Sequence, residues 1–411
     1  MIPRRTRRQP SRPLALGLLL SLAGTPGLAR QLAPPPGFDA AEAPDAGTQP
    51  LGVEPDAKTP PGERQRAERL IARGRLQTEL DEFEGAETSL LEGIDLLIAA
   101  EGEFAADLID PYVALSRTYS RGGRTAEAIT VLEHARHISQ RNFGLFNLEQ
   151  ASLLEEMGEV YERSGDTAKA LEIQHDRLNL ALRQYGEDDP RAIPYRYHLA
   201  EYYERSRMRS GARDQYAAVV DYYESAAGEH DGALLQPLAA VVRMDMLLGE
   251  STRARRRLVE VLELSDNATA IDRATALAVL GDWEMARRQP DGALEYYGRA
   301  YSVLAAERPA LAAQFFSKPA LIDFIPPLSP ADRGGRRDTH AWGAVTARFG
   351  VSATGQATSV TIVSSTPPGL MDSHYLARIS EARFRPRLVA GRPVATHTVR
   401  FEHRFRYYAA D

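Results

Sequence analysis

The sequence predicts a multidomain protein in which an all-α helical solenoid, built from repeats, is followed by a small α+β domain. Two observations predict this order. An alanine recurs at nearly constant spacing through the middle of the chain, as expected for stacked helix pairs. After Trp342 the apolar residues change from a helical period to strict alternation, which is typical of strands. Stretches rich in proline and glycine separate these parts.

Changes in composition divide the 411 residues into five segments. They are a signal peptide at 1–29, a Pro-rich disordered linker at 30–62, the helical solenoid at 63–308, a linker and solenoid cap at 309–341, and the C-terminal domain at 342–408. The first linker is too polar to bury enough apolar surface to offset its ordering entropy. The second contains a cluster of apolar side chains that we expect to cover the end of the solenoid. These are Phe315, Phe316, Leu321, Phe324 and Ile325.

The N-terminus has the three parts of an export signal. A basic region ends at Arg8, an apolar stretch covers Leu14–Ala23, and small residues lead up to Ala29. Even when it is extended to Ala29, the apolar stretch is interrupted by Pro26. It also falls short of the roughly 20 residues that a membrane-spanning helix needs. We therefore expect a cleaved signal, a periplasmic protein and no integral membrane span after cleavage, the alternative being a retained membrane anchor.

Charge and cysteine content limit the partners and the chemistry. The net charge is -6, with -17 in residues 31–319 and +5 in residues 320–411. We expect no nucleic acid as a partner, because phosphate binding requires a clustered basic surface. The chain has no cysteine, which excludes disulfides, thiolate nucleophiles and cysteine-ligated zinc or iron–sulfur sites.

The recurring alanines are equally spaced except for the last interval, from Ala254 to Ala293, which is shorter than the others. Small residues recur twelve positions before most of them, and tyrosines recur nine positions before three of them. Two antiparallel helices approach closely only where small residues face larger ones on the neighbouring helix. The predicted repeat core is Gly74, Ala86, Tyr119, Ala128, Gly158, Tyr161, Ala170, Tyr203, Ala212, Ala254, Gly281 and Ala293.

This pattern of small, aromatic and alanine positions resembles the tetratricopeptide family. The 42-residue period and the phrase Tyr185–Pro190 resemble the longer-helix variety found in kinesin light chains. Eight residues beyond the usual 34 add about one turn to each helix of a pair. The repeat around Ala254 fits the pattern least well. The resemblance implies that the solenoid binds proteins or peptides.

The C-terminal segment reads as strand, strand, helix and strand. Apolar residues alternate from Val345 to Val351 and again from Val399 to Tyr407, and Gly355 marks a turn. Between them, Leu370–Ala382 has a helical stripe. This order resembles the TonB C-terminal family. The matching residues are Gly343, Val345, Phe349, Gly355, Val360, Ser364, Ser365, Leu370, Asp372, Arg383, Phe384, Arg385, Pro386, Gly391, Pro393 and Val394.

The TonB resemblance implies a periplasmic domain that pairs with an extended segment of an outer-membrane receptor by adding a strand to its own sheet edge. Candidate partner-docking residues are Arg383, Phe384, Arg385, Pro386 and Arg392. Arginine on strands also serves simply to keep edges soluble. A family energy transducer has an N-terminal membrane helix with a histidine, whereas the first histidine here is His134.

No catalytic, cofactor-binding or metal-binding residues are predicted. His134 and His137 are spaced so that they share one helix face, but no third metal ligand accompanies them. Phosphate-binding loops, dinucleotide loops and hydrolase motifs are missing from the sequence. The sequence therefore predicts a non-enzymatic, exported periplasmic adaptor. A TonB-type energy transducer with a membrane-retained N-terminus is the alternative.

Overall fold

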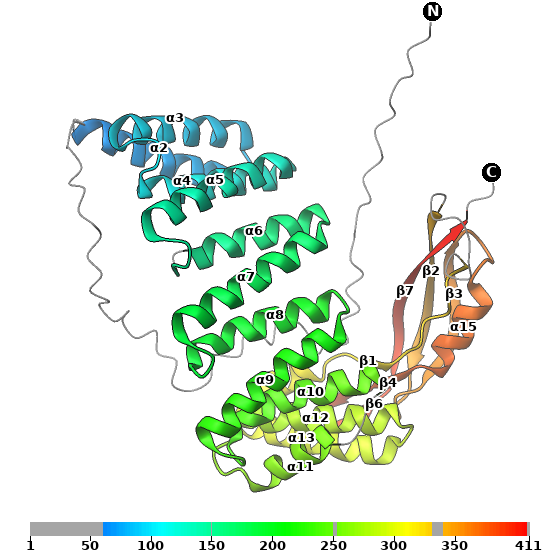
Figure 1. Cartoon of the computed structure of the whole chain (residues 1–411). Coiled ribbons are helices and arrows are strands. Elements are labelled where there is room, and N and C mark those ends of the chain that lie inside the picture. Colours follow the sequence, from blue (N-terminus) through cyan, green and yellow to red (C-terminus); the bar gives the residue numbers. More distant parts are fainter. Residues whose placement is uncertain (1–60, 149, 250–252, 331–339, 409–411) are drawn as a thin grey trace, which may run out of the picture. The chain divides into compact units, whose positions relative to one another are not determined.

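The computed structural model of the chain describes residues 61–148, 150–249, 253–330 and 340–408 (Figure 1). The predicted signal peptide at 1–29 lies outside the described residues, as does the predicted linker up to residue 60. Two compact units meet in the sequence between Met208 and Arg209. The order of elements confirms the predicted fold class, helical repeats followed by a small strand-containing domain.

The described part of the first unit consists of helices joined by short turns. They are α2 (Pro61–Glu79), α3 (Phe83–Glu101), α4 (Ile109–Arg121), α5 (Thr125–Phe143), α6 (Gln150–Ser164), α7 (Thr167–Tyr185) and α8 (Ile193–Arg205). The 3-10 turns η1 (Ala106–Leu108) and η2 (Pro190–Ala192) precede α4 and α8. Because the connections are short, each helix packs on its neighbours in the sequence, and buried side chains from α2 to α8 form one core.

The second unit continues the helix pairs and then changes to strands. Its helices are α9 (Arg209–Ala227), α10 (Leu235–Leu248, after the 3-10 turn η3 at Gly232–Leu234), α11 (Arg253–Leu264), α12 (Ala270–Ala286), α13 (Pro290–Glu307) and α14 (Pro309–Phe315). Helix α12 packs on α10 and α13. Since α14 and the C-terminal domain follow directly, α12 and α13 form the last helix pair before the sheet.

Small residues allow the helices of a pair to approach closely. A Cβ atom added to Gly74 of α2 would lie 2.6 Å from Leu90 Cγ of α3. A Cβ atom on Gly281 of α12 would lie 2.6 Å from Tyr297 Cδ1 of α13. In both pairs the large residue stands four positions after the recurring alanine, so the small position and the large one are partners across the pair.

Most of the predicted repeat-core residues lie in the interior. Gly74, Ala86, Tyr119, Ala128, Gly158, Tyr161, Ala170, Ala212, Gly281 and Ala293 are buried. Tyr203 is only half-buried, and its hydroxyl lies 2.9 Å from His175 Nε2, whereas the adjacent Tyr202 is buried. Ala254 is also half-buried, because it lies in the first turn of α11. The packing expected of Tyr203 and Ala254 is therefore incomplete.

The C-terminal domain is a three-stranded antiparallel sheet with one helix on a face. Strands β2 (His340–Val351), β3 (Ala357–Thr366) and β7 (Thr396–Tyr408) lie in the order β3-β2-β7. The alternating residues of β2 and the helix α15 (Asp372–Glu381) form its core. Short strands make two further pairs, β1 (Ala320–Asp323) with β4 (Arg383–Arg385), and β5 (Arg387–Val389) with β6 (Arg392–Val394).

Three expected boundaries differ from the structure. Helix α2 begins at Pro61, inside the predicted linker, because proline suits the first turn of a helix. The segment 309–341, predicted as a linker and solenoid cap, contains α14 and β1; Phe316 is fully buried, whereas Ile325 is 65% exposed. The helical stripe predicted within Leu370–Ala382 is also displaced at its start: Leu370 is 41% exposed, and the buried residues are Met371, Tyr375, Ile379 and Ala382.

Candidate interaction surfaces

The residues predicted to dock a partner lie mostly in the interior of the second unit. Phe384 and Arg385 of β4 are 4% and 5% exposed, and Pro386 is buried. Arg383 is half-buried, and its guanidinium donates to the carbonyl oxygens of its own neighbours in the chain. Only Arg392 is exposed. The prediction of an exposed patch is therefore wrong for Phe384, Arg385 and Pro386, because β4 pairs with β1 and packs on α12.

Arg385 forms a buried ion pair with Asp282 of α12. Its Nε donates to Asp282 Oδ1 over 2.9 Å, and its Nη2 donates to Asp282 Oδ2. The hydroxyl of Tyr297 donates to the same Oδ1 over 2.8 Å. Because the guanidinium fork matches the carboxylate, the pair is bidentate and fixes the orientation of β4 on α12.

Aromatic rings enclose the guanidinium of Arg385. Its Cζ lies 5.6 Å from the ring centre of Tyr297 and 5.2 Å from that of Phe315. Burial by itself lowers the pKa of Arg385, but the charge of Asp282 and its hydrogen bonds outweigh burial and raise the pKa. Burial raises the pKa of the Tyr297 phenol well above its ordinary value, and the nearby Asp282 charge adds to this. The cluster therefore holds a charged arginine and a neutral tyrosine around one carboxylate.

Further contacts extend this interface along α12, α13 and α14. A Cβ atom on Gly355, where φ is +77°, would lie 2.9 Å from Met285 Cε of α12. The backbone N–H of Leu388 donates to the carbonyl oxygen of Phe316 over 3.0 Å. Gly391 lies against the ring of Tyr301, with 3.1 Å between Tyr301 Cδ1 and an added Cβ. The C-terminal domain is thus attached to the last helix pair along β4, β5 and β6.

The outer edge of β7 is partly covered by the chain's own residues. The hydroxyl of Ser329 accepts a hydrogen bond of 2.9 Å from the backbone N–H of Arg406 and also donates to its carbonyl oxygen. The ring of Phe324 lies edge-on to Phe401, with 5.3 Å between ring centroids. Exposed charges follow the same strand, including Arg404, which pairs with Glu402 over 2.8 Å. Charges and a covering segment both hinder the addition of another strand.

The opposite edge of the sheet, β3, lacks such charges, although an isolated antiparallel bridge joins Arg383 of β4 to Gln356, the residue before β3. Its ten residues, Ala357–Thr366, include no charged residue and no proline, and six of them are β-branched. Within the described residues, β3 pairs with no strand other than β2. A bulge leaves Val363 without a partner on β2, and its side chain is exposed. Such an edge presents unpaired backbone groups to a partner strand.

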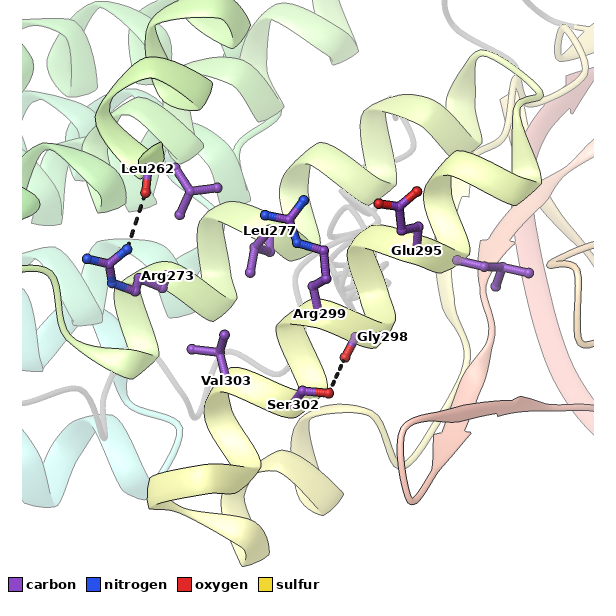
Figure 2. Close-up of a pocket in the computed structure, with 9 residues that line it drawn as sticks. Leu262, Arg273, Leu277, Glu295, Gly298, Arg299, Ser302 and Val303 are labelled. Atoms are coloured by element: carbon purple, nitrogen blue, oxygen red, sulfur yellow. Dashed lines mark hydrogen bonds between the residues drawn. The ribbon is translucent and has the colours of Figure 1, made fainter. Parts of the chain in front are cut away.

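A groove also opens beside the last helix pair (Figure 2). Its volume is about 510 Å³, within the range typical of ligand sites. Side chains from α11, α12 and α13 line it, and apolar and charged groups alternate around it. The lining residues are Leu262, Arg273, Leu277, Leu294, Glu295, Gly298, Arg299, Ser302 and Val303.

The C-terminal domain has the strands, the helix and the turn at Gly355 that the sequence predicts. Residues 337–407 match the family model of the Gram-negative bacterial TonB protein C-terminal. The C-terminal domain is therefore TonB-like in its sequence. The matched region includes β2, β3, α15 and nearly all of β7.

Solved structures similar to this chain are helical-repeat proteins. A putative kinesin light chain from Podospora anserina, with nearly identical TPR-like repeats, is 16% identical over 50% of this chain and 99% of that one, with a TM-score of 0.39. BtubC from P. vanneervenii is 16% identical over 58% and 91%, with a TM-score of 0.37. Apo RapI is 14% identical over 61% and 67%, with a TM-score of 0.40. Among curated proteins, none matches the sequence.

Within residues 61–148, 150–249, 253–330 and 340–408, no group of three or more histidine, aspartate or glutamate residues is placed to hold a metal ion. In the same residues, no helix combines the length and apolar character needed to cross a bilayer. His134 and His137 instead lie edge-on to the rings of Tyr112 and Phe104.

Sequence reasoning missed Asp282 and the groove. Asp282 precedes Arg385 by 103 residues, and no local pattern connects them. One signal was available, because an aspartate immediately after Gly281 falls inside a buried helix, where a carboxylate needs a partner. The groove also had a signal, the shortened alanine interval between Ala254 and Ala293.

Proposed function

We propose that the protein is an exported periplasmic adaptor, in which the helical repeats bind one protein and the TonB-like domain docks an extended strand of another. An outer-membrane receptor is the partner that the family resemblance favours for the docked strand. The families involved are typically non-enzymatic, so we assign no catalytic role and no cofactor. The alternative is a TonB-type energy transducer whose N-terminal segment stays in the membrane.

The observation that carries the docking proposal is the edge of β3, whose residues Ala357–Thr366 pair with no described strand other than β2. A partner strand gains its affinity from backbone hydrogen bonds, and so it requires an edge whose N–H and C=O groups are free. β3 offers ten uncharged residues for this purpose. On β7, the backbone N–H and carbonyl oxygen of Arg406 are already hydrogen-bonded to the hydroxyl of Ser329. We therefore assign docking to β3.

Export is supported by the basic, apolar and small residues of segment 1–29. Mass spectrometry of the protein isolated from the cell envelope tests this directly. A mature terminus near Arg30 would support the adaptor and eliminate the membrane-retained transducer. An intact terminus at Met1 would favour the transducer instead.

Strand docking is tested with single cysteines, because the chain has none of its own. Thr361→Cys places a thiol on β3, and Arg404→Cys places one on β7 as the matched control. After mild oxidation of intact cells, we expect mixed disulfides from position 361 to cysteines engineered into the periplasmic extension of a candidate receptor. Equal capture from both positions, or capture from position 404 alone, would contradict docking at β3.

A further inference from the structure

The groove beside the last helix pair arises because one helix of the repeats ends early. The second helices of the earlier pairs, α3, α5, α7 and α9, have 19 residues each, whereas the described part of α11 has 12 and ends at Leu264. Each of these four helices ends at a glycine with positive φ, and the four glycines recur at the same constant spacing as the alanines. They are Gly102, Gly144, Gly186 and Gly228. The next position in this series is 270, where α12 has already begun.

Arg273 holds the early end of α11 in place. Its Nη1 donates to the carbonyl oxygen of Leu262 over 3.2 Å, and its Nη2 donates to that of Ser265. These oxygens belong to the last turn, where a helix has carbonyl groups with no partner of its own. A cationic side chain at this end also interacts favourably with the helix dipole. The missing turn is therefore replaced by a side chain, and the space beside it stays open.

The open space has an apolar floor and a net positive lining, because Arg273 and Arg299 outnumber the single carboxylate of Glu295. Leu262 and Leu277 are buried at its base, and Leu294 and Val303 are half-buried on its side. Arg299 is exposed, and within the described residues no ion pair to it is present. Its guanidinium lies 5.7 Å from the ring centre of Tyr296. Figure 2 shows Arg299 and Leu277 among the side chains that line the groove.

We propose that this groove binds a short, acidic amphipathic helix of a partner protein. Three helices bound the groove, so it offers no free strand edge, and Leu262 of its lining lies in the last turn of the shortened α11. A helix presents apolar side chains at i, i+3 and i+4 to such a surface. A carboxylate on its polar face neutralises Arg299. This site is separate from β3 and does not depend on strand docking.

Gly298 permits a clean test of the groove. It lies within α13 and lines the groove, and an added Cβ would meet no atom within 4 Å. Leucine at this position therefore projects into open space and also favours the helix more than glycine does. We expect Gly298→Leu to fill the groove without lowering the thermal midpoint, with Gly298→Ala as the matched control.

The probe is a fluorescein-labelled synthetic helix of about three turns, with leucines on one face and glutamates on the other. Fluorescence anisotropy measures its binding to the full chain, alongside a counterpart in which lysine replaces glutamate. We expect the acidic peptide to bind wild type and Gly298→Ala equally, and Gly298→Leu at least about tenfold more weakly, or about 1.4 kcal/mol. Arg299→Glu reverses the preference between the two peptides.

Three results would overturn the proposal. The acidic peptide fails to bind wild type, or it binds Gly298→Leu as well as wild type, or the lysine peptide binds wild type better. Gel filtration adds a fourth. If wild type dimerises and Gly298→Leu is monomeric, the groove belongs to a second copy of the chain. Val363→Lys on β3 leaves peptide binding unchanged, which keeps this test independent of strand docking.

Discussion

Strands β4 and β3 of the TonB-like domain differ in what they offer to a partner. Strand β4 carries Phe384 and Arg385, the aromatic and basic side chains usually associated with binding, yet both are buried against α12. Strand β3 carries only small and β-branched residues, and within the described residues it pairs with no strand other than β2. The comparison teaches that aromatic and basic residues in a sequence do not by themselves locate a docking surface. The decisive property is which backbone and side-chain groups remain unpaired.

Removing Asp282 should have the largest effect. Asp282→Ala leaves the guanidinium of Arg385 buried without a counterion, which typically costs about 3–5 kcal/mol. Chemical denaturation of the full chain, followed by the fluorescence of Trp283, measures the loss in the free energy of unfolding.

The matched control is the double variant Asp282→Ala with Arg385→Leu. It removes both charges, and we expect it to recover most of the lost stability. If the double variant is as unstable as Asp282→Ala alone, the cost comes from packing around α12 and the ion pair does not decide the attachment of β4.

The second-largest effect is expected at alkaline pH, which should lower the free energy of unfolding through two buried tyrosines. Burial raises the pKa of Tyr297, as does the Asp282 charge, and burial likewise raises the pKa of Tyr375, whose hydroxyl donates to the carbonyl oxygen of Phe401. The unfolded chain releases both protons near pH 10, while the folded protein keeps them. The free energy of unfolding therefore falls as the pH rises above about 10.

Denaturation at several pH values between neutrality and pH 11 measures this slope. Tyr297→Phe and Tyr375→Phe should each make it shallower. The slopes of the free energy of unfolding against pH are compared, and not its values at one pH. Each variant also loses one hydrogen bond, which lowers its stability equally at every pH. A slope unchanged by both substitutions would show that other groups control the alkaline response.

A smaller effect is expected at the covered edge of β7. Ser329→Ala removes both hydrogen bonds to the backbone of Arg406 and costs about 1 kcal/mol. It also frees that part of the edge, so amide hydrogen exchange should accelerate near Arg406. Ser317→Ala, at an exposed turn after α14, is the control. Exchange that is equally slow in Ser329→Ala would mean that the neighbouring segment covers β7 without this hydroxyl.

The smallest effect on stability is expected for a substitution on β3. Val363 is exposed at a bulge of β3, so Val363→Lys should change the free energy of unfolding by less than about 0.5 kcal/mol. Lysine on an edge strand opposes strand addition, and so crosslinking from position 361 should fall sharply. Val363→Thr keeps the β-branched shape and should retain capture. Full capture by Val363→Lys would argue that β3 is not the docking edge.

Much of the fold follows from periodicity that is visible in the sequence. The recurring alanines, and the small residues twelve positions before them, locate the helix pairs. Only a small side chain fits where Gly74 meets Leu90 or Gly281 meets Tyr297. Alternation from Val345 to Val351 locates β2 because one face of that strand is buried. Such patterns reflect local geometry, and each is repeated or long enough to be distinguished from chance in the sequence.

The candidate site was less predictable, because its contacts join distant parts of the chain. Arg385 resembles a docking arginine until Asp282 is placed beside it, and β1 is a strand only because β4 pairs with it. The stripe of α15 was misplaced by one residue at its start, since Leu370 precedes the helix and Met371 turns inward. These outcomes depend on tertiary contacts that no local pattern records.

The attachment of β4 to α12 has a mechanical consequence. The TonB-like domain follows α14 covalently through β1, and it is held a second time by the side chains of Arg385 and Asp282. Two separate anchoring points remove the swivelling that a single tether permits. Tension applied to a strand held along β3 would therefore load the antiparallel ladder and pass through β4 into the body of the last helix pair, without first straightening a slack connection.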